Sequence, residues 1–189
     1  MINQKFSFLV GVCALTLGIL ACTMKIGGPA YPTPAIPIST EAVGELQSTL
    51  EAAVSAESSS GQVTLVITES QLTSYLTYWL QAQSQPILTN LQVYLQSGQI
   101  HLYGTAMEGY FEATIGVVLS AGVDSQGQLK IDLTSADFGP VPVPSGFLDV
   151  ITTSIKEAYT SALGPVATGF RLDSITISDG IMTIVGRMK

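Results

Sequence analysis

The sequence predicts an α+β protein in which a long, curved antiparallel meander sheet wraps around amphipathic helices. Apolar and polar residues alternate over most of residues 88–138, which is the period of strands that bury one face. Two other stretches repeat their apolar residues every three or four positions, as helices that cover a sheet do. An N-terminal signal and a tether are expected to precede this single domain.

Residues 1–21 have the layout of a secretory signal. Lys5 supplies the charged start, an apolar run extends from Phe6 to Leu20, and the small residue Ala21 follows. The run is shorter than the ~20 residues that a membrane-spanning helix needs. We therefore interpret it as a cleaved signal.

Residues Ile19-Leu20-Ala21-Cys22 resemble the bacterial lipobox, in which a cysteine receives a diacylglycerol and becomes the new N-terminus. The resemblance implies lipid attachment at Cys22. An ordinary cleaved signal and an uncleaved signal anchor are the alternatives. All three predict an extracytoplasmic domain, which lipidation would attach to the cell membrane.

Charge and cysteine content exclude several classes of site. The chain has 7 basic and 14 acidic residues, and the basic residues are scattered. A nucleic-acid surface needs a basic stripe, and docking on anionic lipid needs a basic cluster, so neither is predicted. The only cysteines are Cys13 and Cys22, so a domain cleaved before Cys22 and acylated there has no disulfide and no cysteine zinc site.

The prolines and glycines of residues 22–38 predict an extended tether, and the domain follows as residues 39–189. A helix is expected over residues 40–56, ahead of a core module at 63–189. In that module, the strand Val63–Thr68 leads directly into a helix that ends near Pro86. Thr68 and Gln71 are spaced as a capping box at its start.

One strand in the meander, Tyr110 to Asp124, is much longer than the typical ~5–6 residues. We expect it to bend, with Gly116 and Gly122 as bending points. A proline-rich step then precedes a helix over about residues 145–163. The chain closes with a hairpin at Asp179-Gly180, the strongest short-range hairpin signal.

No catalytic constellation is visible, so we expect no enzyme activity, no metal and no cofactor. His101 is the only histidine and lies on the polar face of a strand, where a surface role is the simplest interpretation. Glu108 and Glu112 are the one candidate carboxylate pair for hydrolytic chemistry. Solvated strand edges explain these two residues better.

The apolar faces suggest either a filled core or an interior that holds a ligand. Small residues interrupt the large apolar ones and would leave room for a greasy molecule: Gly104, Ala106, Ala113, Ala121 and Ala136. Candidate ligand-lining residues are Leu72, Tyr75, Leu76, Trp79, Phe111, Ile115, Val117, Leu119, Leu129, Ile131, Leu148, Ile151, Ile155 and Tyr159. Both interpretations stay open at this point.

Four features together resemble a known family: the strand and helix from Ile67 to Leu76, the segment Gly98–Gly104, the proline-rich step before a helix, and the terminal Ile175–Ile184. They are similar to small bacterial envelope proteins of the tubular lipid-binding (TULIP, SMP-like) fold, such as the YpmS-like, YceB-like and LmeA-like groups. The resemblance covers residues 63–189. It implies a curved sheet around a long helix and binding of a lipid or other hydrophobic molecule without chemistry. The alternative is a closed-core structural or adaptor module of the cell envelope.

Overall fold

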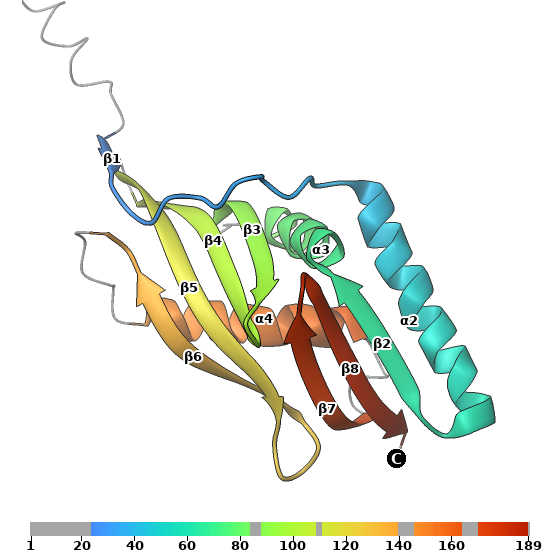
Figure 1. Cartoon of the computed structure of the whole chain (residues 1–189). Helices are drawn as coiled ribbons and strands as arrows, with labels where there is room; N and C mark the ends of the chain where they lie inside the picture. Colours follow the sequence, from blue (N-terminus) through green and yellow to red (C-terminus); the bar gives the residue numbers. More distant parts are fainter. Residues whose placement is uncertain (1–23, 84–87, 109–110, 140–145, 164–169, 189) are drawn as a thin grey trace, which may run out of the picture.

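The computed structural model describes residues 24–83, 88–108, 111–139, 146–163 and 170–188, with only the backbone described at some of these positions. The predicted signal and Cys22 lie outside this part of the chain. The described elements follow one another in this order (Figure 1): β1 (Met24–Ile26), α2 (Thr40–Ser60), β2 (Val63–Thr68), α3 (Glu69–Gln81), β3 (Thr89–Gln96), β4 (Gln99–Glu108), β5 (Phe111–Val123), β6 (Leu129–Asp137), α4 (Phe147–Leu163), β7 (Phe170–Ser178) and β8 (Ile181–Met188).

The predicted α+β class with antiparallel sheets is confirmed. Strands β3 to β6 form the expected antiparallel meander, in which β5 pairs with β4 on one side and with β6 on the other. The short β1 lies parallel to the start of β5. The sequence did not predict that β2 joins the C-terminal hairpin in a second sheet, in which β2 pairs with β8 and β8 with β7.

Local sequence signals account for several boundaries. The predicted capping box is present: the Gln71 backbone N–H donates to Thr68 Oγ1 (3.3 Å), and the Thr68 N–H donates to Gln71 Oε1 (3.0 Å). The predicted hairpin is also confirmed, since Asp179 (φ 51°) and Gly180 (φ 78°) make the β7–β8 turn. Both φ values are positive, as a type I′ turn requires.

The long strand β5 has 13 residues. Its pairing with β6 shifts between Val118 and Leu119, where β6 contributes one extra residue. Such a bulge bends a strand and increases its twist. This irregularity lies between Gly116 and Gly122, the two positions expected to bend.

The edge of β3 is closed by side chains and a turn. Thr73 Oγ1 of α3 accepts from the backbone N–H of Val93 (3.1 Å), and Glu69 Oε1 accepts from that of Leu95 (2.7 Å). The N–H of Gly180 in the β7–β8 turn donates to the Leu95 carbonyl (3.0 Å). These bonds join α3 and the second sheet to the five-stranded sheet.

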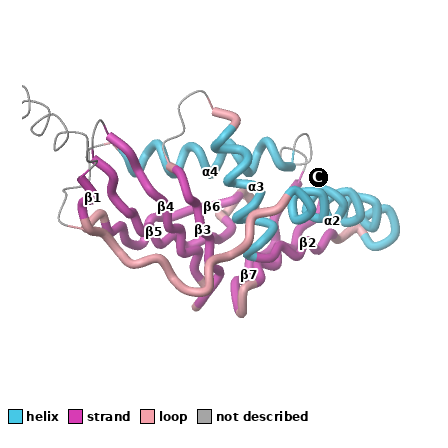
Figure 2. The backbone as a smooth tube through the Cα atoms, turned by 90° about the horizontal axis from the view of Figure 1, so that it is seen from above, coloured by secondary structure: helices cyan, strands magenta, loops and turns pink. Residues whose placement is uncertain are grey.

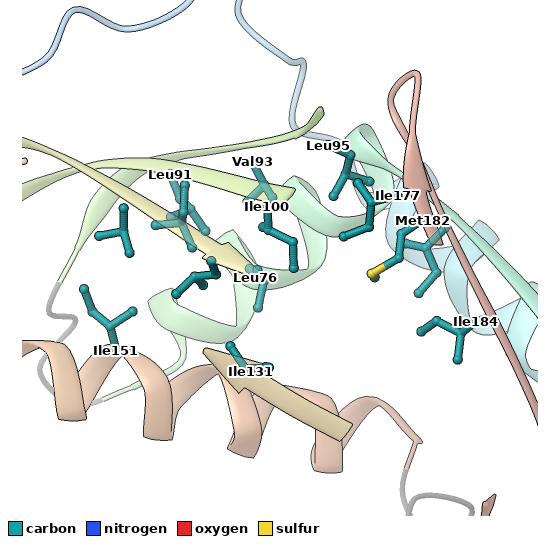
Figure 3. Packing of buried hydrophobic residues seen from close by; sticks show 14 of the residues in the cluster. Leu76, Leu91, Val93, Leu95, Ile100, Ile131, Ile151, Ile177, Met182 and Ile184 are labelled. Carbon is teal, nitrogen blue, oxygen red and sulfur yellow. The ribbon is translucent and has the colours of Figure 1, made fainter. Parts of the chain in front are cut away.

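Helices α3 and α4 face one side of the five-stranded sheet, which we call the inner face, and α2 packs on α3 and β2 (Figure 2). The inner face consists of the alternating apolar residues of the meander. The most deeply buried of them are Leu91, Val93, Leu95, Ile115, Val117 and Leu119. A continuous hydrophobic core links this face to both helices and to the second sheet (Figure 3).

The opposite, outer face is crossed by residues 27–38, which we call the strap (Figure 1). Its backbone at Ile36 both donates to and accepts from the side-chain amide of Gln92 (2.6 and 3.2 Å). The Tyr94 hydroxyl donates to the carbonyls of Pro32 and Pro34, each at 3.2 Å. Within the segment expected to be a tether, Met24–Ile26 form β1 and residues 27–38 lie along the sheet.

No helix in the described residues is long and apolar enough to cross a membrane.

Candidate hydrophobic ligand site

A cavity of about 90 Å³ lies between the inner face, the helices and the second sheet; we call it the main cavity. Every layer of the fold contributes to its wall. The residues that line it are Leu46, Leu50, Leu65, Ile67, Leu72, Tyr75, Leu76, Ile100, Leu102, Leu119, Ala121, Leu129, Ile131, Ile155, Ile175, Met182 and Ile184.

The wall of the main cavity is almost wholly hydrocarbon. Tyr75 is the only one of its lining residues with a polar side-chain atom, and burial raises the pKa of that phenol. Water held in a cavity needs two to four polar partners, and apolar cavities of this kind stay dry. The main cavity is therefore suited to an apolar group and offers no charged group to recognise an ionic one.

A second, smaller cavity of about 20 Å³ adjoins the first, and we call it the end cavity. It lies between α3, the start of the meander and the first half of α4. Its lining residues are Leu76, Trp79, Leu80, Leu88, Leu91, Leu102, Ile151, Ser154 and Ile155. Ser154 is the only residue in this set that carries a side-chain hydroxyl.

The structure brings many of the predicted lining residues together. Seven of them line the main cavity: Leu72, Tyr75, Leu76, Leu119, Leu129, Ile131 and Ile155. Trp79 and Ile151 line the end cavity. Ile115 and Val117 are fully buried in the core and are not among the residues that line either cavity. The side chains of Phe111, Leu148 and Tyr159 lie outside the described part of the chain.

The sequence did not indicate that β2, β8 and α2, which lie outside the meander, contribute to the wall of the main cavity. Leu65 and Ile67 of β2 and Met182 and Ile184 of β8 line the main cavity, as does Leu46 of α2. The signal was present, because the two strands alternate apolar and polar residues. Alternation does not reveal which sheet a strand joins, so these residues were not assigned to the site.

The small residues of the inner face have different roles. Ala121 lines the main cavity, so its short side chain does leave room there. Gly104 leaves no empty space, because a Cβ at this position would lie 3.3 Å from Leu88 Cδ2. The space beside Gly104 is thus filled by Leu88, which itself lines the end cavity.

The structure does not bring Glu108 and Glu112 together as a carboxylate pair. Backbone pairing sets Glu112 opposite Met107 and Glu108 opposite Phe111. Residues directly opposite each other share a face of the sheet, so Glu108 and Glu112 occupy positions on opposite faces. Within the described residues, no group of three histidine, cysteine or acidic side chains is placed to hold a metal ion.

Comparison with known proteins yields little. No protein-family model matches the sequence, and no curated protein matches it. A solved structure titled "Crystal structure of lipopolysaccharide binding protein" is 12% identical, with a TM-score of 0.30. The match covers 68% of this chain and 50% of that one, so the chain spans half the length of that protein. At this TM-score the likeness does not define a shared fold, and the site must be judged by its own geometry.

Proposed function

We propose that this protein binds the hydrocarbon part of a lipid or another hydrophobic molecule in the main cavity. The observation that carries the proposal is the wall itself: it is apolar throughout except for Tyr75, and it is assembled from both sheets and three helices. Withdrawing hydrocarbon from water into such a wall is favourable by about 0.8 kcal/mol per methylene group. The binding is non-catalytic.

The size of the cavity limits what it holds in this conformation. Pockets for drug-sized ligands measure roughly 300–1,000 Å³, whereas the main cavity measures about 90 Å³. It accommodates a segment of an alkyl chain but not a whole lipid. A polar head group would therefore remain outside.

The small volume also supports a second candidate function, a closed-core structural or adaptor module of the cell envelope. In that case the main cavity is a packing defect and binds nothing. The two candidates differ in what happens when the cavity is filled. Filling a ligand site abolishes binding, whereas filling a packing defect only alters stability.

The test compares two alanines on the inner face. Ala121→Leu fills the main cavity, and the control Ala136→Leu makes the same change at a partly buried core position that does not line this cavity. Binding of radiolabelled dodecanoate to the full chain in nanodiscs is measured by equilibrium dialysis, with empty nanodiscs subtracted. We expect Ala121→Leu to weaken binding at least about tenfold, which corresponds to 1.4 kcal/mol. Equal affinity in both variants, or no binding by the wild-type chain, would reject the proposed ligand site.

We further propose that Cys22 is lipidated and that this lipid attaches the extracytoplasmic domain to the cell membrane. The lipobox-like Ile19–Cys22 supports this proposal. Mass spectrometry of the N-terminal peptide should show a diacylglycerol on Cys22, and Cys22→Ser should release the protein from the membrane fraction. An unmodified Cys22 in membrane-bound protein would overturn the assignment.

A further inference from the structure

Three side chains separate the main cavity from the end cavity. Leu76 of α3, Leu102 of β4 and Ile155 of α4 line both cavities, and we call them the waist. Figure 3 shows Leu76 between two groups of core residues. Leu91 and Ile151 lie on the side of the end cavity, and Met182 and Ile184 lie on the side of the main cavity.

The waist is built from flexible hydrocarbon. Leu76 and Leu102 are buried, whereas Ile155 is partly exposed on α4. Each of the three side chains has alternative staggered rotamers, and a change of rotamer moves its terminal methyl groups. Such rotamer changes at the waist would join the two cavities without any change in the order of strands or helices.

We infer that the ligand is a linear, unbranched hydrocarbon chain that fills the main cavity and passes the waist into the end cavity. This inference rests on the function proposed above. An unbranched chain is one methylene wide and can pass between the three side chains of the waist. A branched chain or a fused-ring ligand is wider and needs a cavity without such a constriction. The end cavity, at about 20 Å³, has room only for the terminal methyl group of the chain. The waist and the end cavity thus set the chain length that the protein prefers.

The test is a series of fatty acids of different length, measured by dialysis on the full chain in nanodiscs. Wild-type protein should prefer hexadecanoate over octanoate. It should bind phytanate, which carries methyl branches on a chain of the same length, at least about tenfold more weakly than hexadecanoate, because branches cannot pass the waist.

Ser154→Leu fills the end cavity from α4. Each buried methylene contributes about fourfold to affinity, so loss of the terminal position in the end cavity should lower hexadecanoate affinity about fourfold. Octanoate is the shorter chain, and its affinity should fall less than that of hexadecanoate. Ile155→Ala opens the waist and should raise affinity for hexadecanoate relative to octanoate. The control Leu129→Ala enlarges only the main cavity and should change both affinities by the same factor.

The outcomes separate this inference from the proposed function. If no fatty acid binds to the wild-type chain, both fail. If fatty acids bind but Ser154→Leu and Ile155→Ala keep the wild-type dependence on chain length, or phytanate binds as well as hexadecanoate, the inference alone fails. Circular dichroism checks the folding of each variant. Should Ser154→Leu not fold, the smaller change Ser154→Val decides in its place.

Discussion

The two faces of the five-stranded sheet are covered in opposite ways. On the outer face, the strap is held by directed contacts: Gln92 pairs with the backbone of Ile36, and the Tyr94 hydroxyl donates to two proline carbonyls. A Cβ on Gly28 would overlap the Thr114 carbonyl, so the strap lies as close to the sheet as a backbone can. On the inner face, apolar side chains meet without directed contacts around the main cavity.

The difference shows how one alternating sequence builds two kinds of surface. Hydrogen bonds depend on distance and angle, so the outer face accepts one segment in one register. Dispersion and hydrophobic burial are non-directional, so the inner face tolerates unfilled space and different occupants. The outer face is therefore expected to be rigid and the inner face adaptable.

The largest expected effect lies within the inner face. Leu95→Ala removes a side chain that is 0% exposed and should lower the free energy of unfolding by about 2–5 kcal/mol. Leu129→Ala, the same change in the partly exposed cavity wall, should cost about 1 kcal/mol or less, because less of its surface is buried. Urea unfolding measures both. Equal losses would mean that the wall is as tightly packed as the rest of the core.

On the outer face, Gly116→Ala should cost about 1–3 kcal/mol through overpacking. A Cβ at Gly116 would lie 2.9 Å from Pro29 Cγ in the strap and 3.4 Å from Tyr103 Cε1. Gly122→Ala is the matched control on the same face of β5, since a Cβ there meets nothing within 4 Å. If both variants unfold at the same urea concentration, the strap does not pack on β5 as described.

Tyr94→Phe removes only the hydroxyl that donates to Pro32 and Pro34. We expect a loss of about 0.5–1.5 kcal/mol in the free energy of unfolding and faster hydrogen exchange at the Ile36 amide. Tyr78→Phe, at an exposed position of α3, should change neither quantity. Unaltered exchange at Ile36 in the Tyr94 variant would show that the strap is held by other contacts.

The smallest expected effect is a loss of stability at alkaline pH. Burial raises the pKa of Tyr94, and the charges of Glu69 and Tyr103 raise it further. Its phenol thus ionises more readily in the unfolded chain, where the pKa is near 10.0, so stability is kept below this pH and declines as pH rises above it. Burial also raises the pKa of Tyr31 in the strap. Unfolding measured from neutral pH to above pH 10 should show a shallower decline in Tyr94→Phe than in the wild-type chain.

Local elements were predictable from the sequence because each depends on neighbouring residues. The capping box at Thr68, the turn at Asp179-Gly180 and the alternation of the meander all belong to this group. The helix expected at 40–56 continues to Ser60, and the one expected from 145 begins at Phe147. Helix ends of this kind depend on caps and turns that the sequence specifies less sharply.

The strap and the cavity were not predictable in the same way. Prolines and glycines indicate where regular structure is absent, but Gln92 and Tyr94 lie more than 55 positions from their partners in the strap. Likewise, the alternation of β2 and β8 predicts strands without predicting that they pair with each other. The candidate site was therefore anticipated on α3, β5, β6 and α4, and missed on α2, β3, β4 and the second sheet.

The most direct test of the central claim uses Met182, whose side chain lines the main cavity. The full chain is labelled with ¹³C at its methionine methyl groups, and Met182→Leu identifies the signal of this residue. Dodecanoate that carries a nitroxide on its head group, which stays outside the cavity, should broaden the Met182 signal, and Ala121→Leu should abolish the effect. A Met182 signal that stays sharp while the labelled fatty acid is bound would place the ligand elsewhere and contradict a binding site on the inner face.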